Sequence, residues 1–296
     1  MMTSLLCRWY CLAMKIDLTD ITYIRGLMKS FDKSFSKSLG QNFLTNSAVL
    51  DDIATAAGID SDSYVLEIGP GIGTLTRVLA ERAAKVVSVE IDDKLIPVLE
   101  YTLSDKDKVT IVNNDILKTD IPALIAEHFE GKKVKLVANL PYYITTPIIL
   151  ELIKHRDCFS SLTVMVQKEV AERMAAKEGS KDFGSLSVHV QYYTNAEIQF
   201  IVPAHDFVPA PKVSSAVIRL DILDEPSVIP ADEKNFFRVV RGAFALRRKT
   251  LVNSLASAGF TKEQTLAALS EMGIDTNIRG EKLSLEQFKQ LSDILM

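Results

Sequence analysis

The sequence predicts an α/β protein in which an open, Rossmann-like parallel sheet with an antiparallel edge hairpin is followed by a small all-helical domain. Short β-branched-rich runs alternate with helical stretches between residues 64 and 166. A Pro-rich turn then joins two later strands, and helical periodicity takes over after Asp224. A chain of 296 residues, 47% hydrophobic, is long enough for one large domain and a small one.

Residues 1–27 are expected to be a poorly ordered N-terminal extension. This stretch is apolar but interrupted by Arg8, and Met14 and Met28 are alternative starting points. It has neither a charged leading region nor a small-residue cleavage site, so no signal peptide is predicted. No run reaches the ~20 apolar residues that a membrane span needs.

Charge and cysteine content narrow the functional class. A formal charge of −4 argues against a uniformly basic nucleic-acid binder, but two basic stretches remain, and charge runs usually form solvated surfaces. They contain Arg25, Lys29, Lys33 and Lys37, and Arg238, Arg241, Arg247, Arg248 and Lys249. The three cysteines, Cys7, Cys11 and Cys158, match neither a disulfide framework nor a zinc cluster, so a metal-free cytoplasmic protein is predicted.

The strands and helices of the large domain, residues 28–224, can be placed in order. Asn46 is expected to cap a helix over residues 47–57, which Gly58 ends. Parallel strands are expected at residues 64–68, 86–89, 109–112, 135–137 and 162–166, and the edge hairpin near residues 196–202 and 213–220. Residues 185–193 alternate like a strand but remain ambiguous by pattern alone.

The helical domain is expected to cover residues 225–296. Phe236, Val240, Ala243 and Phe244 form an apolar helical stripe. Two later segments, beginning at Thr261 and Ser284, match the capping-box pattern that opens a helix.

A glycine-rich turn after the first parallel strand predicts a nucleoside-binding site. Gly69, Gly71 and Gly73 precede a helical stretch, and their missing side chains allow the backbone to approach a ligand. A dinucleotide fingerprint needs its third glycine at position 74, which is Thr74. The turn therefore favours S-adenosylmethionine over NAD.

Two carboxylates follow the next strands. Glu90 is placed to accept hydrogen bonds from the ribose hydroxyls of the cofactor, and Asp115 from its adenine amine. The alternatives are compensation of a helix dipole for Glu90 and a plain N-cap for Asp115.

The segment 139–142, Asn-Leu-Pro-Tyr, suits methyl transfer to an adenine amine, a poor nucleophile because its lone pair is delocalised. The Asn139 side-chain carbonyl and the Leu140 backbone carbonyl are expected to accept its N–H groups. Pro141 fixes φ and removes a competing donor, and Tyr142 offers a stacking face. Phe207 is expected to stack on the other face of the base, and the alternative is that it is a core residue of the hairpin. The alternative for residues 139–142 is a simple β-turn after a strand.

These motifs resemble the bacterial 16S ribosomal RNA adenine dimethyltransferases from about Lys37 to Phe288. The matching segments are residues 38–44, 67–73, 139–142, 167–171, 211–217 and 247–251. The resemblance implies dimethylation of two adjacent adenosines near the 3′ end of 16S rRNA during small-subunit assembly, and a class I S-adenosylmethionine methyltransferase sheet. It also implies a helix over residues 185–193.

The resemblance further implies particular contacts. Cofactor contacts fall on Asn42, Leu44, Gly69, Glu90, Asp115 and Asn139. The helical domain of a monomeric enzyme is expected to bind RNA through Arg247, Arg248 and Lys249. Departures from the family pattern are Glu178 where Pro is common, Tyr143 after the target motif, and residues 1–27, which have no recognised counterpart.

Three other functions stay open at this stage. The first is a 23S rRNA adenine methyltransferase that confers macrolide resistance, although residues 211–217 and 244–251 favour the 16S enzyme. The second is a mainly noncatalytic assembly factor of the 30S subunit. The third is a nicotinamide-dependent oxidoreductase, weakened by Thr74 and by only four histidines.

Overall fold

The computed structural model describes residues 16–33 and 41–296. The chain divides into two compact units. The first unit contains the residues up to Lys168 and Ile198–Leu220, and the second unit contains Glu169–Glu197 and Asp221–Met296. This division differs from the predicted one at residue 224. Residues 169–197, which were predicted to belong to the large domain, group with the C-terminal helices.

A seven-stranded sheet has the order β4-β3-β2-β5-β6-β9-β7. Its strands are β2 (Tyr64–Ile68), β3 (Lys85–Glu90), β4 (Val109–Asn113), β5 (Val134–Asn139), β6 (Phe159–Gln167), β7 (Thr194–Val202) and β9 (Ser215–Ile222). β2 to β6 pair in parallel, and all five predicted parallel strands are confirmed. β7 and β9, consecutive long strands, lie next to each other at the sheet edge and form the expected hairpin.

The strand order changes direction at β2. The chain runs outward from β2 through β3 to β4 and then returns to β5 on the other side of β2. Ile68 of β2 pairs with Ala138 of β5, so the loops that follow these two strands start side by side. Ligands of open α/β sheets bind at such a switch point, beyond the carboxyl ends of the strands.

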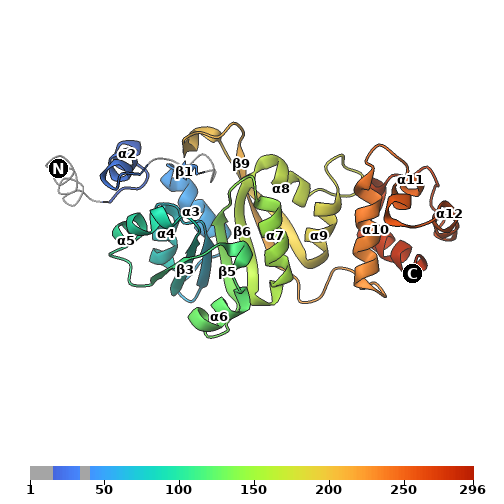
Figure 1. Cartoon of the computed structure of the whole chain (residues 1–296), viewed down its shortest axis with the longest axis horizontal. Helices are drawn as coiled ribbons and strands as arrows, with labels where there is room; N and C mark the ends of the chain where they lie inside the picture. Colours follow the sequence, from blue (N-terminus) through green and yellow to red (C-terminus); the bar gives the residue numbers. More distant parts are fainter. Residues whose placement is uncertain (1–15, 34–40) are drawn as a thin grey trace. The chain divides into compact units, whose positions relative to one another are not determined.

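Helices accompany this sheet in the first unit (Figure 1). They are α3 (Ser47–Ala56), α4 (Thr74–Arg82), α5 (Ile96–Thr102), α6 (Ile121–Phe129) and α7 (Thr145–Lys154), with short 3-10 turns η1 (Asp93–Leu95), η2 (Ile116–Lys118), η3 (Arg156–Cys158) and η4 (Ala204–Asp206). As expected, the Asn46 side chain caps α3 by accepting from the Ala48 N–H at 3.1 Å. A two-residue strand, β1 (Phe43–Leu44), pairs antiparallel with β8 (Phe207–Val208).

An additional helix, α2 (Ile21–Ser30), corrects the prediction that residues up to 27 are poorly ordered. The Asp20 carboxylate caps it by accepting from the Thr22 and Tyr23 N–H groups. Its apolar face is buried with side chains from the first unit in one cluster: Leu18, Tyr23, Ile24, Leu27, Met28, Phe43, Ile72, Leu95 and Val98. Residues 1–15 lie outside the described residues, as do Cys7 and Cys11.

The second unit is helical (Figure 1). Its helices are α8 (Lys168–Met174), α9 (Ser185–Tyr193), α10 (Glu233–Ala245), α11 (Leu251–Leu255), α12 (Lys262–Glu271) and α13 (Leu285–Ile294), with η5 (Ala256–Ala258) and η6 (Gly280–Lys282). Both predicted capping boxes are confirmed: Thr261 pairs with Gln264, and Ser284 with Gln287. Across residues 16–33 and 41–296, no helix is long and apolar enough to cross a membrane.

Candidate active site

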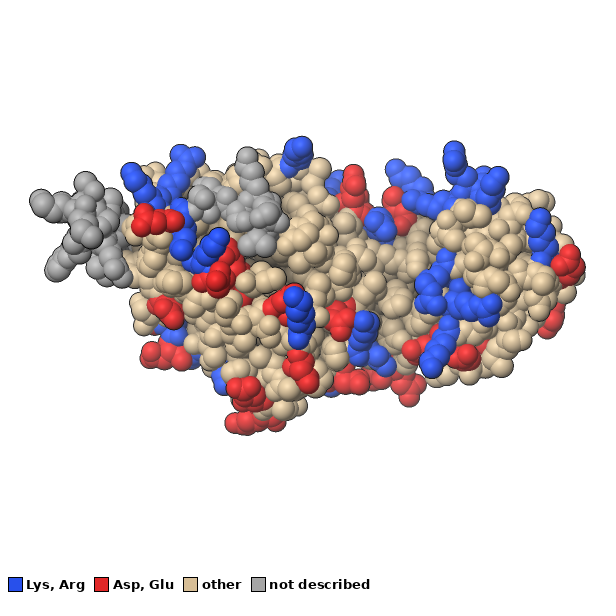
Figure 2. Space-filling view, in the orientation of Figure 1, with Lys and Arg blue, Asp and Glu red and all other residues tan. Residues whose placement is uncertain are grey.

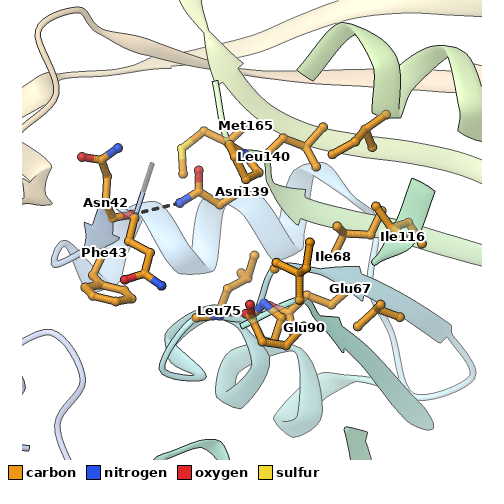
Figure 3. Close-up of a pocket in the computed structure, with 18 of the residues that line it drawn as sticks. Asn42, Phe43, Glu67, Ile68, Leu75, Glu90, Ile116, Asn139, Leu140 and Met165 are labelled. Atoms are coloured by element: carbon orange, nitrogen blue, oxygen red, sulfur yellow. Dashed lines mark hydrogen bonds between the residues drawn. The ribbon is translucent and has the colours of Figure 1, made fainter. Parts of the chain in front are cut away.

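A cavity opens at the carboxyl ends of β2, β3, β4 and β5, at the switch point of the sheet. It encloses about 1110 Å3, its open mouth included, and all its lining residues belong to the first unit. Its lining combines apolar side chains with a few polar groups from the loops after these strands, the composition typical of sites that bind a small molecule. Figure 3 shows Asn139 and Leu140 on one side of this cavity and Glu67, Leu75 and Glu90 on another.

The turn after β2, residues 69–73, is the glycine loop of the cavity. Gly69, Gly71 and Gly73 all have positive φ angles, of 70°, 62° and 88°. A Cβ atom on Gly71 would lie 2.9 Å from Cε1 of Phe43, closer than real Cβ contacts. Gly71 is therefore required both by the backbone conformation and by the neighbouring ring.

Glu90 connects this loop to the one after β3. Its Oε2 accepts from the Gly71 N–H at 3.1 Å, and its Oε1 accepts from the Asp92 N–H at 2.8 Å. The side chain is buried, and burial raises the pKa of the carboxyl above its ordinary value. Each carboxylate oxygen keeps acceptor capacity for a ligand, since it has two lone pairs.

Glu67 is a residue of the cavity that sequence reasoning missed. It is 1% exposed, and its Oε2 accepts from the hydroxyls of Thr76 and Ser88, both at 2.7 Å. Burial, with a smaller contribution from the nearby Glu90 charge, raises the pKa of this carboxyl to about 7. The available signal was an acidic residue inside the apolar run of β2, because carboxylates are rarely fully buried without partners.

Thr74 places an unpartnered hydroxyl beside the cavity. It is the first residue of α4 and is 8% exposed, and its Oγ1 has no hydrogen-bond partner among the described residues. The preceding Gly73 has no side chain that could cap α4, so no side chain at the N-cap accepts a hydrogen bond from the first N–H groups of this helix. A buried orphan hydroxyl at a helix N-terminus fits a polar, negatively charged ligand group.

Asp115 has the N-cap role that the sequence left open as an alternative, and it also lies at the cavity. It caps η2, because its Oδ1 accepts from the Leu117 N–H at 3.0 Å. It also lines the cavity, where its Oδ2 lies 3.5 Å from the Lys118 ammonium.

The amide of Asn139, the last residue of β5, is held in one orientation. Its Nδ2 donates to the Asn42 backbone oxygen at 3.3 Å, the dashed line in Figure 3. The side-chain oxygen is therefore the atom of this amide that is left for a ligand donor. Asn42 and the buried Leu44 also line the cavity, and the Leu140 N–H donates to the Met165 oxygen at 3.0 Å.

Residues 141–144 form the turn that follows. The Pro141 oxygen accepts from the Ile144 N–H at 3.2 Å and from the Thr145 hydroxyl at 3.0 Å. Tyr142 lies in this turn, half-buried, and its hydroxyl is 2.6 Å from that of Ser215 on β9. Burial raises the pKa of Tyr142, so the phenol stays protonated and its ring orientation is fixed by a neutral hydrogen bond.

Phe207 is not placed to stack on the other face of the base. Its side chain is 2% exposed and belongs to the hydrophobic core cluster that includes Leu50 and Ile53. The pairing of β8 with β1 places Phe207 opposite Leu44, which lines the cavity, whereas Phe207 itself does not. The alternative, a core residue, therefore describes Phe207 in this structure.

Basic side chains gather on the second unit (Figure 2). Arg247, Arg248 and Lys249 are exposed in the turn between α10 and α11. Arg238 has a structural role, because it donates to the Ala258 oxygen and lies over the Phe260 ring at 4.2 Å. Of the N-terminal basic stretch, Arg25 and Lys29 are exposed on α2, and Lys37 lies outside the described residues. No group of three or more potential metal ligands occurs in the described part of the chain.

Comparison with known proteins agrees with this geometry. The family model described as "Ribosomal RNA adenine dimethylase" matches residues 32–296. A protein of Ligilactobacillus salivarius named "Ribosomal RNA small subunit methyltransferase A" is 51% identical over 285 residues, which cover 95% of this chain and 96% of the relative. A Clostridium perfringens protein of the same name is 50% identical over 282 residues, covering 95% and 98%.

Solved structures show the same fold. A dimethyladenosine transferase from Plasmodium falciparum is 28% identical, with a TM-score of 0.71 over 84% of this chain and 95% of that one. The 23S rRNA methyltransferase ErmE is 29% identical, with a TM-score of 0.67 over 86% and 99%. With its glycine loop and its Asn-Leu-Pro-Tyr turn meeting in one cavity, the chain belongs to the ribosomal RNA adenine dimethylase family, whose members are S-adenosylmethionine-dependent rRNA methyltransferases.

Proposed function

We propose that this enzyme transfers methyl groups from S-adenosylmethionine to the exocyclic N6 of two adjacent adenosines near the 3′ end of 16S rRNA, and dimethylates each. The observation that carries the proposal is the Asn139 amide. It is fixed by the Asn42 oxygen, so that its own oxygen serves a cavity that the glycine loop also lines. Relatives at about 50% identity, named as small-subunit methyltransferases, support the 16S substrate over the 23S one of ErmE.

The cavity fits the cofactor in three respects. The buried orphan hydroxyl of Thr74 and the N-terminus of α4 suit the cofactor's carboxylate, and Gly71 lets the backbone of the glycine loop approach the cofactor without a side chain. Glu90 would accept from the ribose hydroxyls and Asp115 from the adenine amine, while Asn42, Leu44 and Gly69 complete the contacts. When bound, the cofactor supplies an electrophilic methyl group on a sulfonium.

The residues of the Asn-Leu-Pro-Tyr turn prepare the target amine. The Asn139 side-chain oxygen and the Leu140 backbone oxygen would each accept one N–H, which favours a pyramidal nitrogen with a localised lone pair. Pro141 has no competing donor, and the anchored ring of Tyr142 would stack on the extruded base. After the first methylation only one N–H remains, so the second transfer requires rotation about the C6–N bond.

The exposed turn of Arg247, Arg248 and Lys249 is proposed to contact rRNA phosphates, since none of the three side chains forms an ion pair with a carboxylate of the described residues. In this proposal the enzyme is a monomer, uses no metal and acts in the cytoplasm.

Incorporation of labelled methyl groups into 30S subunits that lack this modification tests the proposal, with the modified nucleotides then mapped. The expected result is dimethylation of two adjacent adenosines near the 3′ end of 16S rRNA. Incorporation into 50S subunits, with reduced macrolide susceptibility of cells expressing the gene, would favour the 23S enzyme instead. Cofactor binding without incorporation would favour the noncatalytic assembly factor.

A further inference from the structure

Tyr143 is an exposed aromatic ring at the mouth of the cavity. Tyr143 lines the cavity, yet 57% of its surface is exposed. Among the described residues it has neither a hydrogen bond nor a ring partner. A large side chain that is left exposed beside a binding cavity suggests a surface that becomes covered when the substrate binds.

The turn keeps the two neighbouring tyrosines in different environments. Tyr142 and Tyr143 are its two central residues, and the two hydrogen bonds to the Pro141 oxygen fix its backbone. Tyr142 is half-buried and hydrogen-bonded to Ser215, while Tyr143 has no hydrogen-bond partner in the described part of the chain. The anchored ring therefore suits the base inside the cavity, and the exposed ring is available to a different base.

Extruding a base leaves its neighbour without a stacking partner on one side. An aromatic side chain can replace that partner whatever the base, because every base has a π-face. A tyrosine suits this rim position, since its ring contacts the base while its hydroxyl stays in water.

We propose that Tyr143 is a second stacking platform, which holds the nucleotide next to the adenosine in the cavity. The inference rests on the proposed function, in which that neighbour is the second target adenosine. Tyr143 then holds one adenosine of the pair while the other is methylated. Its loss weakens substrate binding and lowers the yield of fully dimethylated pairs without affecting the cofactor.

The test compares Tyr143→Ala and Tyr143→Phe with the wild type and with Ile201→Ala. Ile201 is a matched control because it is 45% exposed and belongs to the first unit, but does not line the cavity. KM and kcat are measured with unmodified 30S subunits, the methylation states of both adenosines by mass spectrometry, and S-adenosylhomocysteine affinity by calorimetry. Melting temperatures establish that all variants are folded.

Tyr143→Ala is expected to raise KM for 30S subunits about tenfold, a loss typical of one base–aromatic stack. Fully dimethylated pairs should become rarer relative to singly modified ones, with cofactor affinity unchanged. Tyr143→Phe and Ile201→Ala should resemble the wild type, because the first keeps the ring and the second lies elsewhere.

Two results would overturn the inference while leaving the proposed function intact. One is a Tyr143→Ala enzyme with wild-type KM and product distribution. The other is an equal loss of cofactor affinity in Tyr143→Ala, which would make the ring part of the cofactor site. A wild-type enzyme that methylates no 30S subunits would instead refute the proposed function, and the inference with it.

Discussion

The two sides of the cavity are built differently. On the cofactor side, the loops after β2 and β3 are joined through Glu90, and Phe43 packs closely against Gly71. On the target side, single hydrogen bonds fix Asn139 and Tyr142, while Tyr143 is exposed. The proposed cofactor is the same in every cycle, whereas the target amine differs between the first and second transfer. Hydrogen bonds between loops and close packing are therefore concentrated on the side whose ligand does not vary.

Removing the Asn139 amide should have the largest effect on the target side. Asn139→Ala is expected to abolish methyl transfer, a loss of at least about 100-fold in kcat, because an acceptor for the attacking amine disappears. The fold should remain intact, as measured by thermal unfolding beside labelled methyl incorporation. Asn195→Ala, which removes an exposed amide outside the cavity, is the control. Substantial activity in Asn139→Ala would refute the role of this residue.

A side chain on Gly71 should damage the cofactor side. Gly71→Ala combines a left-handed backbone, which costs about 1–2 kcal/mol for other residues, with displacement of the Phe43 ring. We expect at least about a tenfold loss of S-adenosylhomocysteine affinity by calorimetry.

Gly131→Ala is the matched control for Gly71→Ala. Gly131 also has a positive φ, of 72°, but among the described residues no atom beyond its chain neighbours lies within 4 Å of a Cβ built there. Its replacement should lower stability without changing cofactor affinity. Equal affinity losses in both variants would show that Phe43 packing is irrelevant to the site.

Glu67 should make stability depend on pH. Burial raises the pKa of its carboxyl from the ordinary 4.5 to about 7, so the folded state binds this proton more tightly than the unfolded state. The stabilisation that results is fully present below pH 4.5 and is lost as pH rises through 7. Since one pKa unit corresponds to about 1.4 kcal/mol, the loss is roughly 3 kcal/mol.

Denaturant unfolding of Glu67→Gln across this pH window tests the assignment, because the amide cannot ionise. The variant should lack the decrease in stability that the wild type shows between pH 4.5 and 7. Glu100→Gln, at an exposed position, should parallel the wild type. Parallel curves for Glu67→Gln and the wild type would contradict the assignment.

The hydrogen bond between Tyr142 and Ser215 should contribute least. Tyr142→Phe and Ser215→Ala each remove it, so each should lower kcat/KM by about fivefold, corresponding to ~1 kcal/mol. Because both changes break the same contact, the double variant should be little worse than either single one. Fully additive effects would show that the bond does not orient the ring.

Local patterns were enough to predict the sheet and much of the cavity. β-branched runs located the parallel strands, and turn chemistry located the glycine loop and the Asn46 cap, because these depend on neighbours in sequence. Asn139 and the glycine loop were expected to meet because parallel strands end at one edge, and the register of Ile68 with Ala138 confirms it.

Features that depend on distant partners were not predictable. α2 could not be predicted from local pattern, because its apolar face packs against Phe43, Ile72 and Leu95, which lie farther along the chain. The prediction that Phe207 stacks on the base was wrong, because the direction of its ring depends on the pairing of β8 with β1.

Pattern alone also left α9 ambiguous. Its buried positions include Leu186, Ser187, Val188 and Val190, so it lacks the one-sided stripe of a surface helix.

The packing of α2 has a consequence for any shortened version of the chain. A polypeptide that began at Met28 would lose Tyr23, Ile24 and Leu27 from their cluster. Water would then reach the rear of Phe43 and Leu95, whose other surfaces line the cavity. Such a truncated enzyme would keep every residue that touches substrate and still bind its methyl donor poorly.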